Sequence, residues 1–331
     1  MTAPASWCRP HNGNIVSIAN PHLQGPEGQK ILNLKRWAAV ASMSVAGMLV
    51  VTKLFAFFTT NSVSLLSSLM DSAFDALASL VTMMSIIHAA TPADAEHRYG
   101  HGKLEALSAL AQAVFVFGSA VFLILESVRR FITPLAVHDP AVGIKVMIFS
   151  IVMTACLITF QAYVMRRTKS IAVSADNLHY RGDLLMNLGV FAALAASYYS
   201  AWPYFDPIIA SVIALSLLFG AYKITRESFD ILMDKELPDA DREKILALAS
   251  GHPMVESAHD LRTRSTGERV FIEFHIEVDG KLSVERAHDI TEELEKKIYD
   301  AFPTSEVLIH QEPAGMEHHR IDDAIPVATA V

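Results

Sequence analysis

The sequence predicts a membrane protein with an all-α domain of six transmembrane helices and a smaller cytoplasmic α+β domain. The first observation behind this prediction is a series of six apolar stretches before Pro238, each long enough to supply the roughly 20 residues that a helix needs to cross the hydrocarbon core. The second is a change after Pro238 to amphipathic and alternating patterns. The composition agrees, because 19% of the 331 residues are charged, against about 25% in soluble domains.

The net charge and the cysteines narrow the function classes. A net charge of -8 argues against a nucleic-acid partner, whose phosphates require basic patches. The two cysteines, Cys8 and Cys156, form no CxxC pair. The sequence therefore predicts neither a disulfide framework nor a thiolate zinc site.

The chain begins with a polar segment and continues into the apolar stretches. Residues 1–30 are rich in Pro, Gly, Asn and His, and we expect them to form a disordered cytoplasmic leader. Residues 31–236 are expected to form the transmembrane domain. Its six predicted spans lie near residues 37–59, 62–90, 104–131, 141–165, 174–200 and 207–232.

Basic residues lie mostly on one side of the predicted membrane domain, which predicts that both termini are cytoplasmic. The loops expected on the other side, residues 134–140 and 201–206, contain no Lys or Arg. Arg129 and Arg130 are the exceptions on that side. The basic residues expected on the cytoplasmic side are Lys30, Lys35, Arg36, Arg98, Lys103, Arg166, Arg167, Lys169, Lys223, Arg226 and Lys235.

Residues 237–313 are expected to form the α+β domain, with a flexible tail over residues 314–331. Residues 270–278 alternate strictly between apolar and polar side chains, which is typical of a half-buried strand. Ser283 is the expected N-cap of the second helix. The element order is αββαβ, as in a ferredoxin-like or metallochaperone-like domain, with both helices on one face of the sheet. The predicted elements are a helix over residues 239–249, strands over 255–264 and 270–278, a helix over 283–302 and a strand over 307–310.

Two of the predicted spans carry polar stripes. Residues three or four apart lie on the same face of a helix. Asp71 and Asp75 in the second span have this spacing, and so do His179 and Asp183 in the fifth. The complete stripes are Ser64, Ser68, Asp71, Asp75 and Ser79 in the second span, and Asp176, His179, Asp183 and Asn187 in the fifth.

The stripes predict a cation site within the membrane. An aspartate at the centre of a transmembrane helix costs about 2.5–3.5 kcal/mol, so such groups face one another, water or a bound cation. Three oxygen ligands and one nitrogen suit tetrahedral Zn²⁺ and would also accept Fe²⁺ or Cd²⁺. Hydrogen bonding between helices, or a proton relay without metal, is the alternative. The candidate ligands are Asp71, Asp75, His179 and Asp183.

Two further groups of ligand-type residues lie outside the spans. The loop after the second span contains Asp94, His97 and His101, which would bind a metal or form an ordinary solvated loop. The α+β domain contains four histidines and a carboxylate in or near its strands and second helix, although single histidines are commonly packed or solvated. These residues are His259, His275, His288, His310 and Glu312.

Taken together, these motifs resemble the cation diffusion facilitator family, from about residue 34 to residue 313. The motif around Asp71 and Asp75 reads SLMDSAFD, and the loop from His97 to Lys103 reads HRYGHGK. The remaining motifs are DNLHYRGD from Asp176, HDLRTR from His259, and IHQEP around His310 and Glu312.

The resemblance implies three metal sites and a homodimer. It implies a transport site at the intramembrane quartet, a second site in the loop, and a binuclear site in the α+β domain that binds metal across the dimer interface. It also implies that Lys103 and Asp234 form a charge pair that holds the membrane domain to its partner. The sequence departs from the family at Glu312, where close relatives usually have Asp; glutamate keeps the charge but reaches one methylene further.

The sequence therefore predicts a proton-coupled antiporter that exports Zn²⁺ from the cytoplasm across the bacterial inner membrane, with Fe²⁺ and Cd²⁺ as alternative cargo. Bound metal ions, protons, lipid and a second copy of the chain are the expected partners. A non-transporting membrane metal sensor or scaffold is the alternative function. An enzyme is not expected, because the HExxH motif of an intramembrane metal-dependent hydrolase is absent.

Overall fold

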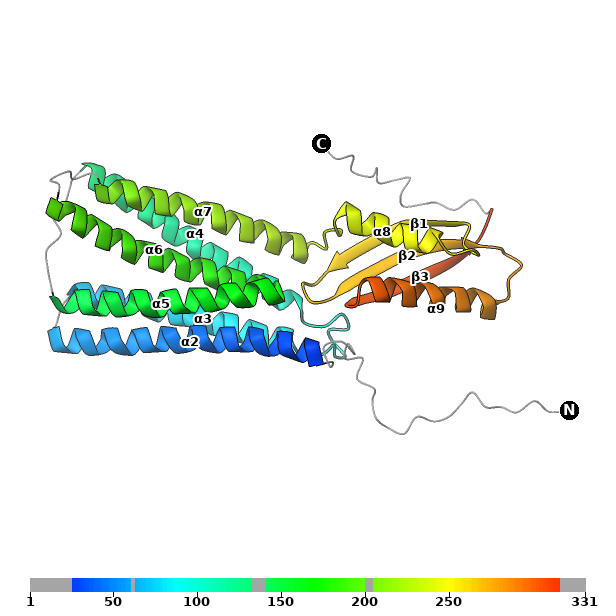
Figure 1. Ribbon diagram of the computed structural model, residues 1–331, viewed down its shortest axis with the longest axis horizontal. Coiled ribbons are helices and arrows are strands. Elements are labelled where there is room, and N and C mark those ends of the chain that lie inside the picture. Colours follow the sequence, from blue (N-terminus) through cyan, green and yellow to red (C-terminus); the bar gives the residue numbers. More distant parts are fainter. Residues whose placement is uncertain (1–25, 61–62, 133–140, 200–204, 316–331) are drawn as a thin grey trace, which may run out of the picture.

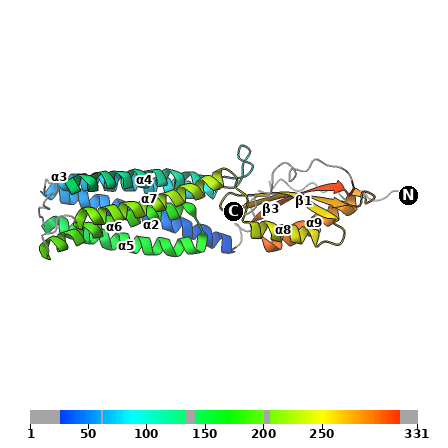
Figure 2. The ribbon, with the colours of Figure 1, turned by 90° about the horizontal axis from the view of Figure 1, so that it is seen from above.

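The computed structural model describes residues 26–60, 63–132, 141–199 and 205–315. The predicted loop over residues 134–140 and the predicted flexible tail, apart from its first two residues, lie outside this part of the chain. So do most of the predicted leader and of the loop over residues 201–206. The remaining residues form an elongated bundle of long helices with an α+β domain at one end (Figure 1, and turned by 90° in Figure 2).

Within the described residues, six long helices build the bundle, as predicted. The first begins at Pro26, so residues 26–30 are helical and the expectation of a disordered leader up to residue 30 was wrong for them. Proline favours the first turn of a helix, where its missing N–H has no partner to lose. The helices are α2 (Pro26–Thr60), α3 (Val63–Ala89), α4 (Lys103–Ile132), α5 (Ala141–Thr168), α6 (Ile171–Tyr199) and α7 (Phe205–Leu232).

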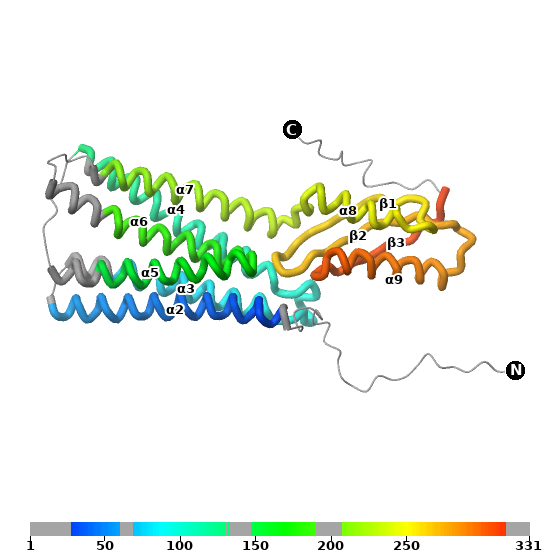
Figure 3. The backbone as a smooth tube through the Cα atoms, viewed as in Figure 1, coloured from blue at the N-terminus to red at the C-terminus, as the bar shows by residue number. Residues whose placement is uncertain are grey.

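Five of these helices are long and apolar enough to cross a membrane, counted over the described residues. The exception is α6, which has 29 residues but contains Asp176, Arg181 and Asp183 in its first half. It lies within the bundle beside its neighbours (Figures 1 and 3). Of these charged residues, Asp176 and Asp183 belong to the polar stripe predicted from the sequence, whereas Arg181 is exposed.

The bundle exposes large apolar side chains, as a surface in contact with lipid does. Phe55, Phe58 and Phe219 are each at least 70% exposed. Polar side chains such as Ser42, Gln112 and Gln161 are at most 2% exposed. This arrangement reverses the one expected of a protein dissolved in water, where large apolar patches mark contact surfaces.

The α+β domain has the predicted element order. Its sheet has the strand order β1-β2-β3, with an antiparallel β1–β2 pair and a parallel β2–β3 pair. The parallel pair requires a crossover, which α9 provides. The elements are α8 (Asp239–Ser250), β1 (Ser257–Ser265), β2 (Val270–Val278), α9 (Val284–Ala301) and β3 (Ser305–Pro313).

One face of the sheet forms the core of this domain, as the alternation in β2 predicted. Ile272, Phe274 and Ile276 point to the same face and are at most 1% exposed. They form one cluster with Ile245 of α8 and Leu294 of α9. Both helices therefore cover one face, which leaves the polar side chains of β2 on the other face. The predicted N-cap is also confirmed, because the side chain of Ser283 accepts a hydrogen bond from the backbone N–H of Arg286.

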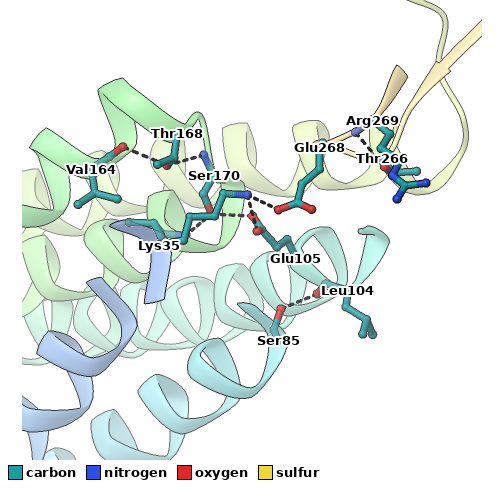
Figure 4. A network of polar contacts seen from close by, with 12 residues as sticks. Lys35, Ser85, Leu104, Glu105, Val164, Thr168, Ser170, Thr266, Glu268 and Arg269 are labelled. Carbon is teal, nitrogen blue, oxygen red and sulfur yellow. Dashed lines mark hydrogen bonds and ion pairs between the residues drawn. The ribbon is translucent and has the colours of Figure 1, made fainter. Parts of the chain in front are cut away.

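A buried ion cluster joins the two domains (Figure 4). Lys35 of α2 is 3% exposed, and its Nζ lies 2.8 Å from carboxylate oxygens of both Glu105 and Glu268. Glu105 belongs to α4, and Glu268 lies between β1 and β2. Ser170, between α5 and α6, donates a 2.6 Å hydrogen bond to Glu105. The first membrane helix is thus tied to the β1–β2 hairpin.

A second junction involves the predicted charge pair. The Nζ of Lys103 lies 2.9 Å from the carboxylate of Asp234. Arg264 of β1 lies 3.9 Å from the same carboxylate, and its guanidinium stacks 4.2 Å from the ring centroid of Tyr99. The pair is half-exposed, and its role in holding the domains together stays a prediction.

Candidate metal sites

The intramembrane stripes of α3 and α6 face one another. The Nε2 of His179 lies 3.0 Å from Asp75 Oδ1 and 3.9 Å from Asp183 Oδ2. One ligand atom from each of the three lies within 4.8 Å of the others. A nitrogen and two carboxylate oxygens at this spacing form a donor set that could close on one small divalent ion.

The fourth predicted ligand of this site, Asp71, lies outside the group. It occupies an exposed position one helical turn before Asp75 and is close enough to interact electrostatically with it. Its role as a ligand stays a prediction, since a change of side-chain conformation would be needed to complete a quartet.

Lys53, a charged residue in the first predicted span, was not among the predicted site residues. Its Nζ donates a 2.6 Å hydrogen bond to Ser72 Oγ of α3, and it interacts electrostatically with Asp75 and Asp183. A lysine within an apolar stretch is itself a sequence signal, because charges at that depth are rare and face the bundle interior. The described site therefore includes a lysine beside its carboxylates.

The loop between α3 and α4 gathers its three predicted ligands. Asp94 Oδ1 accepts hydrogen bonds from the backbone N–H groups of His97, at 2.6 Å, and Glu96, at 2.9 Å. These bonds hold the pKa of Asp94 below its ordinary value. The other oxygen, Oδ2, lies 3.4 Å from His101 Nε2. One ligand atom from each of Asp94, His97 and His101 lies within 4.8 Å of the others.

Replacing Asp94 by asparagine should weaken zinc binding at the loop by about 10-fold or more. Asparagine keeps an oxygen that accepts the two backbone hydrogen bonds, but it removes the negative ligand. Calorimetric titration of purified protein would measure the change, in a background of Asp75→Ala and Glu312→Gln that silences the other clusters. Glu96→Gln, which removes an equal charge from the same loop, should leave the affinity unchanged. An equal loss in both variants would show that only the loop's charge matters.

Strand register explains the third cluster. His259 of β1 pairs with His275 of β2, and His275 pairs with His310 of β3. The three imidazoles therefore form a row across the sheet, on the face that the helices leave uncovered. A register shift between His259 and Arg262 interrupts the β1–β2 ladder directly after the first of them. Such irregularities redirect side chains at the edges of sheets.

Glu312 lies at the centre of this row. Its Oε1 is 2.9 Å from His275 Nδ1 and 3.7 Å from His310 Nε2, and its Oε2 is 3.3 Å from His259 Nε2. His259 is 6% exposed, and among the described residues neither of its ring nitrogens makes a well-aligned hydrogen bond, although Nε2 lies near the carboxylate of Glu312. Buried polar atoms are normally satisfied, so the donor set fits a bound metal ion. The longer side chain of glutamate, noted as a departure, reaches all three histidines.

The remaining predicted ligand of this domain, His288, is not brought into the cluster. It lies on α9, exposed, and its Nε2 is 3.3 Å from Glu292 four residues later. The helices cover the opposite face of the sheet from the histidine row. Its membership in a binuclear site stays a prediction and would require a second chain.

Glu312→Gln should lower the zinc affinity of the α+β domain by at least about 10-fold, because the ligand that lies beside both His259 and His275 loses its charge. The measurement is a zinc titration of the full-length protein. The matched control is Glu292→Gln, which removes an equal charge beside the outlying His288 and should have little effect on a single chain. Loss of binding only in the control would move the site from the sheet to α9.

Comparison with known proteins assigns the chain to a protein family. The family model described as the cation efflux transmembrane domain matches residues 39–233, and the model described as the cation efflux protein, cytoplasmic domain, matches residues 237–314. The chain belongs to the cation efflux family. It is therefore a membrane-embedded cation efflux transporter, and its family is one of transporters and not of enzymes.

Curated relatives agree with this assignment to the cation efflux family. The cation-efflux pump FieF of Salmonella typhimurium is 42% identical over 279 residues, which cover 84% of this chain and 93% of the relative. FieF of Salmonella choleraesuis is 41% identical over the same span. The metal-bound C-terminal domain of the CzcD transporter from Thermotoga maritima is 38% identical, covering 24% of this chain and 93% of that one, with a TM-score of 0.23.

Proposed function

We propose that this cation efflux protein exports Zn²⁺ from the cytoplasm in exchange for protons. The observation that carries the proposal is the convergence of Asp75, His179 and Asp183 from two helices within the bundle. Imidazole and carboxylate ligands are those that zinc takes in proteins. Fe²⁺ and Cd²⁺ remain alternative cargo, since these ligand types do not separate divalent metals sharply.

Competition between metal and protons would supply the coupling. Imidazole and carboxylate groups bind metal when they are deprotonated, so metal binding releases protons and protonation expels metal. Each ligand therefore weakens the affinity of the site for the other. A site that opens alternately to the two sides of the membrane would let an inward proton gradient drive metal outward.

The proposed setting is a homodimer in the bacterial inner membrane with both termini in the cytoplasm. Lys35, Arg166 and Lys235 lie at or near the helix ends that face the α+β domain, which supports a cytoplasmic location for that domain. Metal bound by the His259, His275 and Glu312 cluster would favour association of two such domains and so report the metal load.

Zinc flux into liposomes that contain the purified protein tests the proposal. Flux that increases when a pH gradient is imposed, and that falls when the gradient is collapsed, is the expected result. Flux that ignores the gradient would contradict proton coupling. Zinc binding without flux under any gradient would favour the alternative, a membrane metal sensor or scaffold built on the same fold.

His179→Ala should weaken the dependence of zinc flux on the pH gradient. The substitution removes the one imidazole of the cluster, and histidine is the side chain suited to exchange protons near neutral pH. Zinc flux would be measured at several imposed pH gradients, with the same zinc concentration each time. His88→Ala, in an exposed histidine at the end of the same helix that carries Asp75, is the matched control and should retain the full dependence.

A further inference from the structure

Asp176 belongs to the polar stripe of α6 but to none of the three clusters. Its side chain is 1% exposed, and it lies three residues, or about one turn, before His179. A carboxylate within the membrane domain must be solvated by the protein itself, because neither lipid nor bulk water reaches it.

Three neighbouring helices supply the hydrogen bonds that Asp176 requires. Ser42 Oγ of α2 and Gln161 Nε2 of α5 each donate to Asp176 Oδ2 at 2.6 Å. Gln112 Nε2 of α4 donates to Oδ1 at 3.3 Å, and the same amide also donates to Thr82 of α3. Groups from α2, α4 and α5 thus converge on one carboxylate of α6, and α3 is linked to it through Gln112.

The next turn of α6 is held in a similar way. The hydroxyl groups of Tyr180 and Ser79 lie 2.7 Å apart, and Ser79 belongs to α3, the helix that carries Asp75. Gly182 lets α6 pack closely on α7, since a Cβ there would lie 3.1 Å from the side chain of Leu217. The helix is therefore held about one turn before His179, at Asp176, and directly after it, at Tyr180.

We propose that Asp176 is a positioning residue of the transport site and determines which divalent ion that site prefers. This inference rests on the proposed function of Asp75, His179 and Asp183 as ligands. Bonds from zinc to nitrogen and oxygen ligands are about 2.0–2.2 Å long, and a larger ion such as Cd²⁺ requires longer ones. A fixed spacing between α3 and α6 favours the smaller ion, because geometry more than ligand type separates such metals.

The test removes two donors to Asp176 one at a time and, in a third variant, the negative charge of Asp176 itself. Ser42→Ala, Gln161→Met and Asp176→Asn would each be reconstituted in liposomes, and zinc and cadmium fluxes measured over a range of concentrations. We expect the KM for zinc to rise by about 10-fold, as when the outer partners of metal ligands are lost. The ratio of cadmium to zinc flux should rise as well. Ser42→Thr, which keeps the hydroxyl, should keep the wild-type ratio.

Ser127→Ala is the matched control. Ser127 of α4 is 1% exposed and donates a 2.6 Å hydrogen bond to the carbonyl of Pro207 in α7. Neither residue takes part in the hydrogen bonds to Asp176. It should lower stability without changing the metal ratio. If Ser42→Ala and Gln161→Met also leave the KM and the ratio unchanged, Asp176 is a packing residue only and the inference fails. If the wild-type protein carries neither zinc nor cadmium, the proposed function fails instead.

Discussion

Asp75→Ala is expected to reduce zinc flux by at least about 100-fold while the protein stays folded. Loss of an outer partner of a metal ligand costs about 10- to 100-fold in affinity or activity, and Asp75 is proposed as a ligand itself. Its Oδ1 lies 3.0 Å from His179 Nε2, so the change also leaves the imidazole without a close carboxylate on α3. Flux into liposomes, normalised to the amount of inserted protein, provides the measurement.

The control for this variant is Glu126→Ala. Glu126 lies on α4 towards the end away from the α+β domain and pairs with Arg129 at 3.8 Å. Its removal deletes a carboxylate from a membrane helix without touching the Asp75 cluster, so normal flux is expected. Normal flux in Asp75→Ala would show that the ion crosses the bundle elsewhere, and the assignment of the transport site would be wrong.

Local patterns were sufficient to predict most of the fold. Strict alternation predicted β2 with its observed bounds, and a serine before an amphipathic stretch predicted the start of α9. Spacing along each helix predicted two polar stripes, and the structure brings Asp75 of one stripe together with His179 and Asp183 of the other. Such inferences succeed because the period of a helix or strand is set by the backbone and needs no knowledge of distant contacts.

Contacts between distant segments were not predictable in the same way. The row of His259, His275 and His310 depends on the register of three strands, which the sequence alone does not specify. Lys35 was interpreted only as a charge that sets membrane orientation. Its partners lie 70 and 233 residues away along the chain, and no spacing rule relates them.

Lys35→Met is expected to destabilise the protein by about 3–5 kcal/mol, the cost of removing one partner from a buried ion pair. Lys35, Glu105 and Glu268 are all at most 12% exposed in their side chains, so water does not screen the charges that remain. Ser170 continues to donate to Glu105, but Glu268 loses its close cation. Thermal unfolding of the purified protein would register the change as a lower midpoint.

Lys103→Met is the control for Lys35→Met. It removes an ion pair at the second junction between the domains, but the charge left behind is in contact with solvent. The side chains of Lys103 and Asp234 are 36% and 38% exposed, and pairs in contact with solvent contribute about 0–1 kcal/mol. The triple change Lys35→Met, Glu105→Gln and Glu268→Gln should recover much of the stability, because a buried ion cluster is replaced by uncharged groups. A midpoint for Lys35→Met no lower than that for Lys103→Met would mean that water reaches the cluster, and that charge burial does not hold α2 to the β1–β2 hairpin.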